Sequence, residues 1–199
     1  MFVKINADDL RDNCADYYVN GRKIASTSSQ LCKDLTRITL YENQQPRYKL
    51  IEHSRMEWIL FNWAYPLSFF LPFFLNPVYD IYDGTKKVGA SLERWLKPIH
   101  NFSIRNDIYR DHLHKNETFS LHKNGQQIAL YIKDPCTFYS TTEQQRSYSI
   151  WYDESVPTWI IYMFCIFYDW LFFSCHPGTK KIMVYNDSHI EYTKWRPIQ

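Results

Sequence analysis

An aspartate stands inside a strongly apolar stretch of the sequence. Between Val156 and Cys175, Asp169 is the only charged residue. An ionised carboxylate in a lipid or protein interior costs several kcal/mol unless it is paired or neutral. Two interpretations follow. Asp169 is a buried helix charge that locks the helix to a partner or binds a polar ligand, or it is a helix-end acid that reaches water or is held by a strand arginine.

Pairs of adjacent basic residues form a second candidate site. Two of the three pairs follow turn dipeptides of the same kind, so they would gather at one end of a closed sheet. Such a ring suits anionic lipid head groups, where each charge near the surface contributes on the order of 1 kcal/mol. The alternative is that these residues only keep hairpin ends in water. The candidates for lipid head-group binding are Arg22, Lys23, Lys86, Lys87, Lys180 and Lys181.

A third cluster combines two histidines and an acid, His112, His114 and Glu117. On a strand, His112 and His114 would face the same side, which suits metal ligation. The sequence offers no fourth ligand, and a solvated loop explains the cluster better, because residues 111–117 contain no apolar residue except Leu113. We therefore expect no metal site.

Motifs for catalysis are missing from the sequence. It contains no nucleophile elbow, P-loop, dinucleotide-binding fingerprint or zinc-protease helix motif. Cys175 and His176 are adjacent, but a catalytic pair requires spatial meeting and an activated thiolate, which adjacency does not supply. We expect a protein that is not an enzyme and needs no cofactor.

The elements that would position these residues are short antiparallel strands. Asn-Gly and Asp-Gly dipeptides accept the positive φ values of two-residue type I′ turns, and here they are flanked by alternating apolar and polar residues. This pattern predicts three hairpins, at Asn20-Gly21, Asp83-Gly84 and Asn124-Gly125. Further period-two runs occur at 35–41, 47–51, 102–109, 148–152 and 182–185, giving about ten strands.

The three hairpins share one phrase. An aromatic or aliphatic strand leads into the turn, polar residues follow, and then comes Ile24-Ala25, Val88-Gly89 or Ile128-Ala129. Through residues 17–26 and 79–153 this phrase resembles the tubby-like superfamily, which includes tubby C-terminal domains and phospholipid scramblases. The resemblance implies a mainly β fold, a closed antiparallel barrel of about twelve strands around a hydrophobic helix. Some tubby-like domains bind phosphoinositides, so it also implies a lipid contact, although no binding residue can be transferred.

Two apolar segments interrupt the polar sequence. The run from Trp58 to Tyr79 has no charged residue, and aromatic residues flank both runs as in interfacial belts. About 20 apolar residues suffice to cross a bilayer. We expect one domain over residues 1–199, with apolar helical segments at about 58–78 and 157–174.

Two simple crossings would separate the predicted hairpins and forbid a single barrel. Pro66 and Pro72 would break a helix, so the first segment can enter and leave the same membrane face. Alternatively, the second segment is enclosed by the barrel and is apolar all round because it is buried all round. The sequence leaves both arrangements open.

Composition limits the kinds of partner and structural class that this chain can have. The chain of 199 residues has 23 Lys and Arg against 21 Asp and Glu, a formal charge of +2, so we expect no nucleic-acid partner. Five scattered cysteines indicate neither a disulfide framework nor a zinc ribbon. The opening residues lack the apolar region of a secretory signal.

These features together predict a non-catalytic, membrane-associated binding protein on the cytoplasmic side. Its barrel would contact anionic phospholipid or a membrane protein. Two alternatives are a small immunity or inhibitor protein that neutralises a protein partner, and a soluble carrier whose barrel holds an apolar ligand in place of a helix.

Overall fold

The computed structural model describes residues 1–10, 14–30, 35–53, 78–92, 101–114, 118–134, 137–138, 144–172 and 194–197. These residues form thirteen strands and one helix, and successive strands are joined in antiparallel pairs. The elements are β1 (Phe2–Leu10), β2 (Cys14–Val19), β3 (Arg22–Gln30), β4 (Leu35–Glu42), β5 (Gln45–His53), β6 (Val78–Asp83), β7 (Lys86–Leu92), β8 (Asn101–Ile104), β9 (Asp107–His114), β10 (Thr118–Lys123), β11 (Gln126–Lys133), β12 (Thr137–Phe138), β13 (Gln144–Tyr152) and α2 (Thr158–Phe172).

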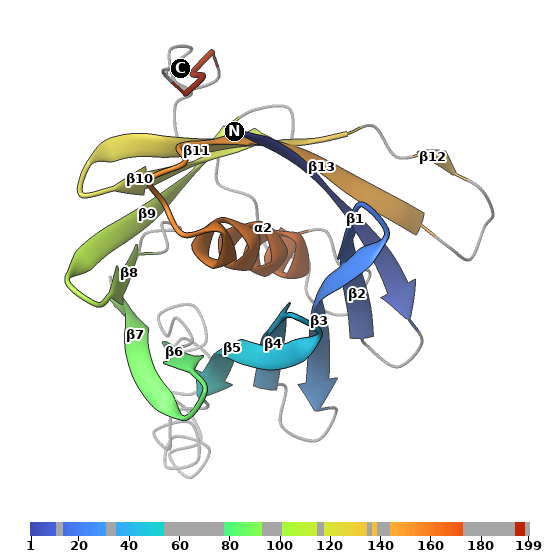
Figure 1. Ribbon diagram of the computed structural model, residues 1–199, viewed down its shortest axis with the longest axis horizontal. Helices are drawn as coiled ribbons and strands as arrows, with labels where there is room; N and C mark the ends of the chain where they lie inside the picture. The colour runs from blue at the N-terminus through green and yellow to red at the C-terminus, as the bar shows by residue number, and fades with distance from the viewer. Residues whose placement is uncertain are drawn as a thin grey trace, which may run out of the picture.

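Twelve of the described strands close into a barrel. Each strand pairs with its neighbour in sequence from β1 to β11, β13 pairs with β11, and β1 pairs with β13. The closing register joins Phe2 to Trp151 and Ala7 to Arg146, while the two-residue β12 only borders β13. The predicted closed antiparallel barrel is therefore confirmed, and Figure 1 shows the strands as a ring.

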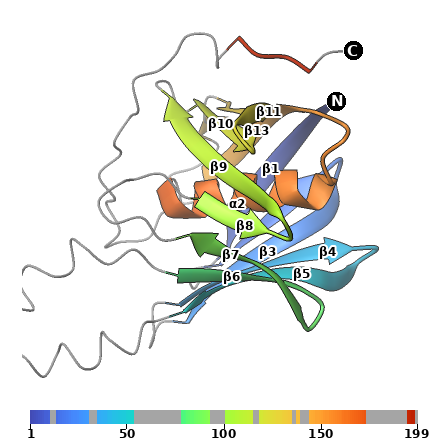
Figure 2. The same cartoon turned by 90° about the vertical axis from the view of Figure 1, so that its left-hand side faces the viewer.

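One end of the barrel consists of two-residue turns, at 20–21, 43–44, 84–85, 105–106 and 124–125. We call this end the turn rim. Asn20-Gly21 and Asn124-Gly125 have positive φ at both residues, as type I′ turns require. In Figure 2 the N-terminus and the β4–β5 and β6–β7 turns all lie toward the right, which identifies the turn rim in that view.

One predicted turn and one predicted strand differ from the structure. Asp83 is the last residue of β6, and the turn is Gly84-Thr85 with positive φ at Gly84 alone, a type II′ pattern. The period-two run 102–109 is not one strand, because Arg105 has a φ of 56° and divides it into β8 and β9. The run 182–185 lies outside the described residues.

The repeated phrase has a structural cause. In four hairpins the register shifts at the same place, three residues before the turn, and one extra residue bulges from the returning strand. In the three predicted hairpins, the small residue that follows the bulged one is Ala25, Gly89 or Ala129. A Cβ atom on Gly89 would lie 2.6 Å from the carbonyl oxygen of Ser103, so this position accepts only glycine without a backbone shift.

Helix α2 fills the barrel. It follows β13 at the turn rim and lies inside the ring of strands, with almost every described side chain buried (Figure 1). Aromatic rings from the wall contact it, for example Tyr48, which stacks on Trp159 with ring centres 4.3 Å apart, and Phe119, which stacks on Tyr168 at 3.8 Å. The Tyr131 hydroxyl donates to the Ile161 carbonyl at 3.2 Å. Of the two sequence-based arrangements, the enclosed helix is the one observed for the second apolar segment.

The first predicted helical segment, about 58–78, lies almost entirely outside the described residues. Within the described part of the chain, no helix combines the length and apolarity that a bilayer crossing needs. The last residue of the predicted segment, Val78, is not helical but begins β6. The next residue, Tyr79, is buried against α2, where its ring meets that of Phe167 edge-on.

Candidate functional site

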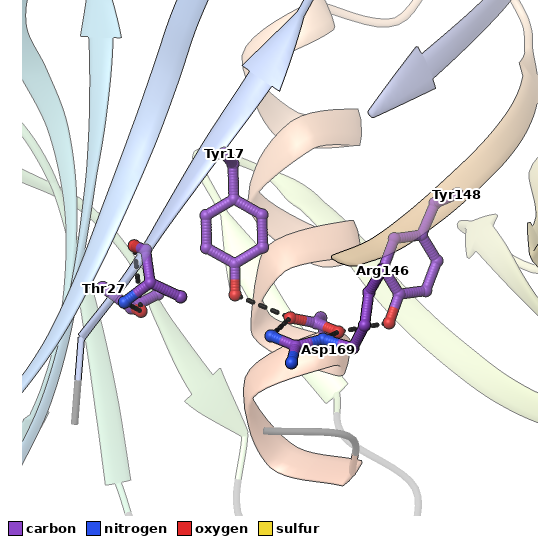
Figure 3. Close-up of polar contacts among 6 residues, drawn as sticks. Tyr17, Thr27, Arg146, Tyr148 and Asp169 are labelled. Atoms are coloured by element: carbon purple, nitrogen blue, oxygen red, sulfur yellow. Dashed lines mark hydrogen bonds and ion pairs between the residues drawn. The ribbon is translucent and has the colours of Figure 1, made fainter. Parts of the chain in front are cut away.

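Asp169 lies inside the barrel, where its carboxylate receives four hydrogen bonds. Arg146 on β13 donates from Nε to Oδ1 at 2.7 Å and from Nη2 to Oδ2 at 3.0 Å. The Tyr17 hydroxyl on β2 donates to Oδ2 at 2.8 Å, and the Tyr148 hydroxyl on β13 donates to Oδ1. Figure 3 shows these side chains converging from the wall on the helix. We call these four residues the inner cluster.

Burial sets the electrostatics of the inner cluster. Asp169 is 0% and Arg146 is 1% exposed, so both charges are removed from water and compensate each other. Burial raises the pKa of Tyr17 and of Tyr148 well above the usual value, and the charge of Asp169 raises both further. Both hydroxyls therefore stay protonated and donate. The arrangement fixes α2 to the wall, because every bond to Asp169 comes from a strand.

The sequence singled out Asp169 and offered a strand arginine as one possible partner, which Arg146 is, but it indicated neither tyrosine. The alternation along β2 and β13 places Tyr17 and Tyr148 inward, yet nothing local indicates that the two strands flank the same point of the helix. A signal existed for Arg146, since it is the basic residue closest before the apolar segment.

The outer wall carries two copies of one polar arrangement. In hairpin β2–β3, Lys23 binds Asp16 at 2.7 Å, and the Tyr18 hydroxyl lies 3.5 Å from the same carboxylate. In hairpin β6–β7, Lys87 binds Asp80 at 2.7 Å and the Tyr82 hydroxyl lies 3.4 Å from it. The predicted candidates Lys23 and Lys87 are thus each held by a carboxylate of their own hairpin.

Their neighbours Arg22 and Lys86 are exposed beside the turns and form no ion pair among the described residues. The structure adds Arg105, an exposed turn residue between β8 and β9 in the same situation, which the sequence patterns did not single out. Lys180 and Lys181 lie outside the described residues. The turn rim therefore presents three cations without a described ionic partner: Arg22, Lys86 and Arg105.

Most described carboxylates at the turn rim are paired with a cation or accept a hydrogen bond from a backbone amide. Arg47 binds both Glu42 and Asp83, and Lys123 binds Asp107 at 2.8 Å. Asp153 accepts a hydrogen bond from the Ser155 amide at 2.9 Å, and Glu154 lies 4.0 Å from the α-amino group of Met1. Three of these acids, Glu42, Asp83 and Asp107, are therefore balanced by cations of the rim itself, whereas Glu154 stays 73% exposed.

The histidines occupy the outer wall of hairpin β10–β11 and strand β9, not a solvated loop. His114 and His122 each place Nε2 near the hydroxyl of Ser120, at 2.8 and 3.1 Å, and the His112 ring lies 4.6 Å from that of His122. Burial, followed by the charge of His112, lowers the pKa of His122 to about 4. Glu117 lies outside the described residues, within which no group of three metal-ligating side chains is arranged to hold an ion.

Comparison of this chain with protein-family models, with curated proteins and with solved structures finds no match. Function must therefore be argued from the geometry of the barrel itself.

Proposed function

We propose that this chain is a non-catalytic binding protein that attaches to the cytoplasmic face of a membrane by contacting anionic phospholipid head groups. The observation that carries the proposal is the charge arrangement at the turn rim. Arg22, Lys86 and Arg105 are exposed there without described ionic partners, whereas the rim acids Glu42, Asp83 and Asp107 are paired with Arg47 or Lys123. Phosphate groups would supply these cations with a counter-charge that the described residues do not provide.

We also propose that the chain belongs to the tubby-like superfamily. The resemblance implies a closed barrel of about twelve strands around a hydrophobic helix, and the twelve-strand barrel around α2 supports it. The bulged hairpins that produce the repeated sequence phrase support it further.

The structure argues against one of the two alternative functions and leaves the other in place. A carrier would need room for an apolar ligand, but α2 occupies the barrel interior and packs against the wall on all sides. A protein that neutralises a protein partner is the remaining alternative, and a stoichiometric protein complex in a pull-down would favour it over lipid binding.

The test is co-sedimentation of the full chain with phosphatidylcholine vesicles that contain or lack phosphatidylserine. We expect binding to the anionic vesicles only. The variant Arg22→Gln, Lys86→Gln, Arg105→Gln should bind them about 100-fold more weakly, because each lost surface charge is worth about 1 kcal/mol.

The matched control is Arg37→Gln, compared with Lys86→Gln. Both remove one exposed cation, but Arg37 lies near the start of β4, about 20 Å along the strand from the nearest turn. Lys86→Gln should weaken binding about five-fold and Arg37→Gln much less. Equal affinity of the triple variant and the unchanged chain for anionic vesicles would refute the proposal.

A further inference from the structure

Large apolar side chains reach solvent at few places among the described residues. The exposed ones are Met1 at 52%, Phe2 at 53% and Ile108 at 48%. Met1 and Phe2 lie at the start of β1, at the turn rim end. Ile108 follows the β8–β9 turn, and its carbonyl accepts a hydrogen bond from the amide of Asn124 in the β10–β11 turn. Met1, Phe2 and Ile108 therefore lie at the same end of the barrel as the cations Arg22, Lys86 and Arg105.

Tyrosines lie on three adjacent hairpins of the wall just behind this rim. Tyr18, Tyr41 and Tyr82 hold the same place in three hairpins, two residues before the turn, and each is half-buried on the outer face. At 3.3–3.4 Å per residue, these rings stand about 7 Å behind the turns. Tyrosine is enriched where proteins meet the head-group layer of a membrane.

A further aromatic and cationic contact lies beside Phe2. The Phe2 ring packs on Trp151 with centres 5.0 Å apart, and the guanidinium of Arg196 lies 4.2 Å from the centre of the Trp151 ring. Arg196 is exposed, so a positive charge stands next to an exposed apolar ring. A cation beside an apolar ring is complementary to a bilayer, whose head groups are anionic and whose interior is apolar.

From these layers we infer that the barrel docks end-on on an anionic phospholipid bilayer, with the turn rim at the membrane and the tyrosines at head-group level. The inference rests on the proposed function and adds its orientation and depth. Phe2 and Ile108 enter the boundary of the acyl chains, while Arg22, Lys86 and Arg105 meet phosphates.

The distribution of these residues around the ring excludes a side-on contact. They belong to the first, third, seventh and ninth of the twelve barrel strands or to the turns beside them. A flat surface against the wall reaches a few adjacent strands, whereas a surface across the end reaches all of them. Only the end-on orientation brings the apolar and cationic residues to one plane.

Hydrogen–deuterium exchange of the full chain on phosphatidylcholine–phosphatidylserine vesicles tests the orientation. We expect slower exchange in peptides that cover all five turns, 20–21, 43–44, 84–85, 105–106 and 124–125. Slowing confined to the turns of one wall would overturn the end-on orientation while leaving the proposed function intact. If the chain does not bind these vesicles at all, the proposed function fails first.

Apolar variants provide a second readout. Phe2→Ser with Ile108→Ser should weaken vesicle binding at least about ten-fold and leave its dependence on salt unchanged, because only apolar contact is lost. Ile51→Ser is the control, since Ile51 is a half-buried apolar residue on the outer wall of β5 away from the turn rim. An equal effect of the control, or no effect of the rim variant, would contradict insertion of the rim.

Discussion

The inner cluster and the outer wall contain ion pairs of the same length in different environments. Arg146 and Asp169 are joined at 2.7 Å inside the barrel, and so are Lys23 with Asp16 and Lys87 with Asp80 on the outside. The inner side chains are 1% and 0% exposed, whereas the two outer lysines are 41% and 53% exposed. Distance alone therefore says little about what each pair does.

Exposure to solvent determines how much each ion pair contributes to stability. A buried charge that loses its partner stays unsolvated, so the inner pair can only be kept or removed as a unit. The exposed lysines are solvated with or without their aspartates, and such pairs contribute about 1 kcal/mol at most. We conclude that the interior charges fix the position of α2, while the outer pairs contribute little to the stability of the barrel.

Hairpin β10–β11 is an intermediate case. The positions of Asp, Tyr and Lys in hairpins β2–β3 and β6–β7 are held here by Ser120, His122 and Gln127. These three side chains face outward but are buried. A buried version of the outer arrangement thus lacks formal charges at neutral pH, as the cost of desolvation requires.

The largest loss of stability is expected when the ion pair of Arg146 and Asp169 is broken. Asp169→Asn leaves Arg146 as a buried charge without a counter-ion, so the free energy of unfolding should fall by about 3–5 kcal/mol. Urea denaturation followed by circular dichroism measures this loss.

The control for this variant removes the whole inner cluster. Arg146→Met, Asp169→Leu, Tyr17→Phe and Tyr148→Phe together delete both charges and both hydroxyl donors, so none of the four hydrogen bonds to Asp169 is left with one partner only. This quadruple variant should recover most of the stability. An Asp169→Asn protein within 1 kcal/mol of the unchanged chain would show that burial is not what distinguishes the two environments.

An intermediate effect is expected from acidification of the His122 site. The folded state lowers the pKa of His122 from 6.5 to about 4, so between these values the unfolded chain binds a proton that the folded chain refuses. Stability is therefore full above pH 6.5 and falls as the pH drops toward 4, by on the order of 1–3 kcal/mol. Urea midpoints measured across this range check the slope.

His122→Gln is the control, because glutamine does not titrate. The groups that face His122 on the described strands are His112, His114 and Arg110, and all three remain in this variant. The acid-dependent loss should shrink in His122→Gln, and an unchanged slope would assign it to other groups.

The elements were predictable where one local signal sufficed. Asn20-Gly21 and Asn124-Gly125 form the expected turns, and α2 at Thr158–Phe172 matches the segment predicted at about 157–174. The turn at Asn43-Gln44 was not predicted, because its positive φ values occur without glycine. Arg105 likewise divides a run that alternates as one strand would.

The candidate site was predictable only in part, since its partners are set by barrel closure. An aspartate in an apolar run is visible locally, and Asp169 was singled out for that reason. Tyr17, which bonds to it, lies 152 positions away in sequence, and only the pairing of β1 with β13 brings β2 near that part of the helix. Which cations lack an ion pair also depends on cross-strand register, so Arg22 could be told from Lys23 only in the structure.

The smallest effect is expected from the outer pairs. Lys23→Met and Lys87→Met keep most of each side-chain stem and remove the ammonium group, so each should lower the free energy of unfolding by less than about 1 kcal/mol. Salt should reduce even this difference, because the pairs are exposed. Urea denaturation at low and high salt measures both. A loss of more than about 2 kcal/mol from either variant would mean that the outer pairs hold the wall together as Arg146 and Asp169 hold the helix. Exposure to solvent would then not separate the ion pairs that hold the fold from those that do not.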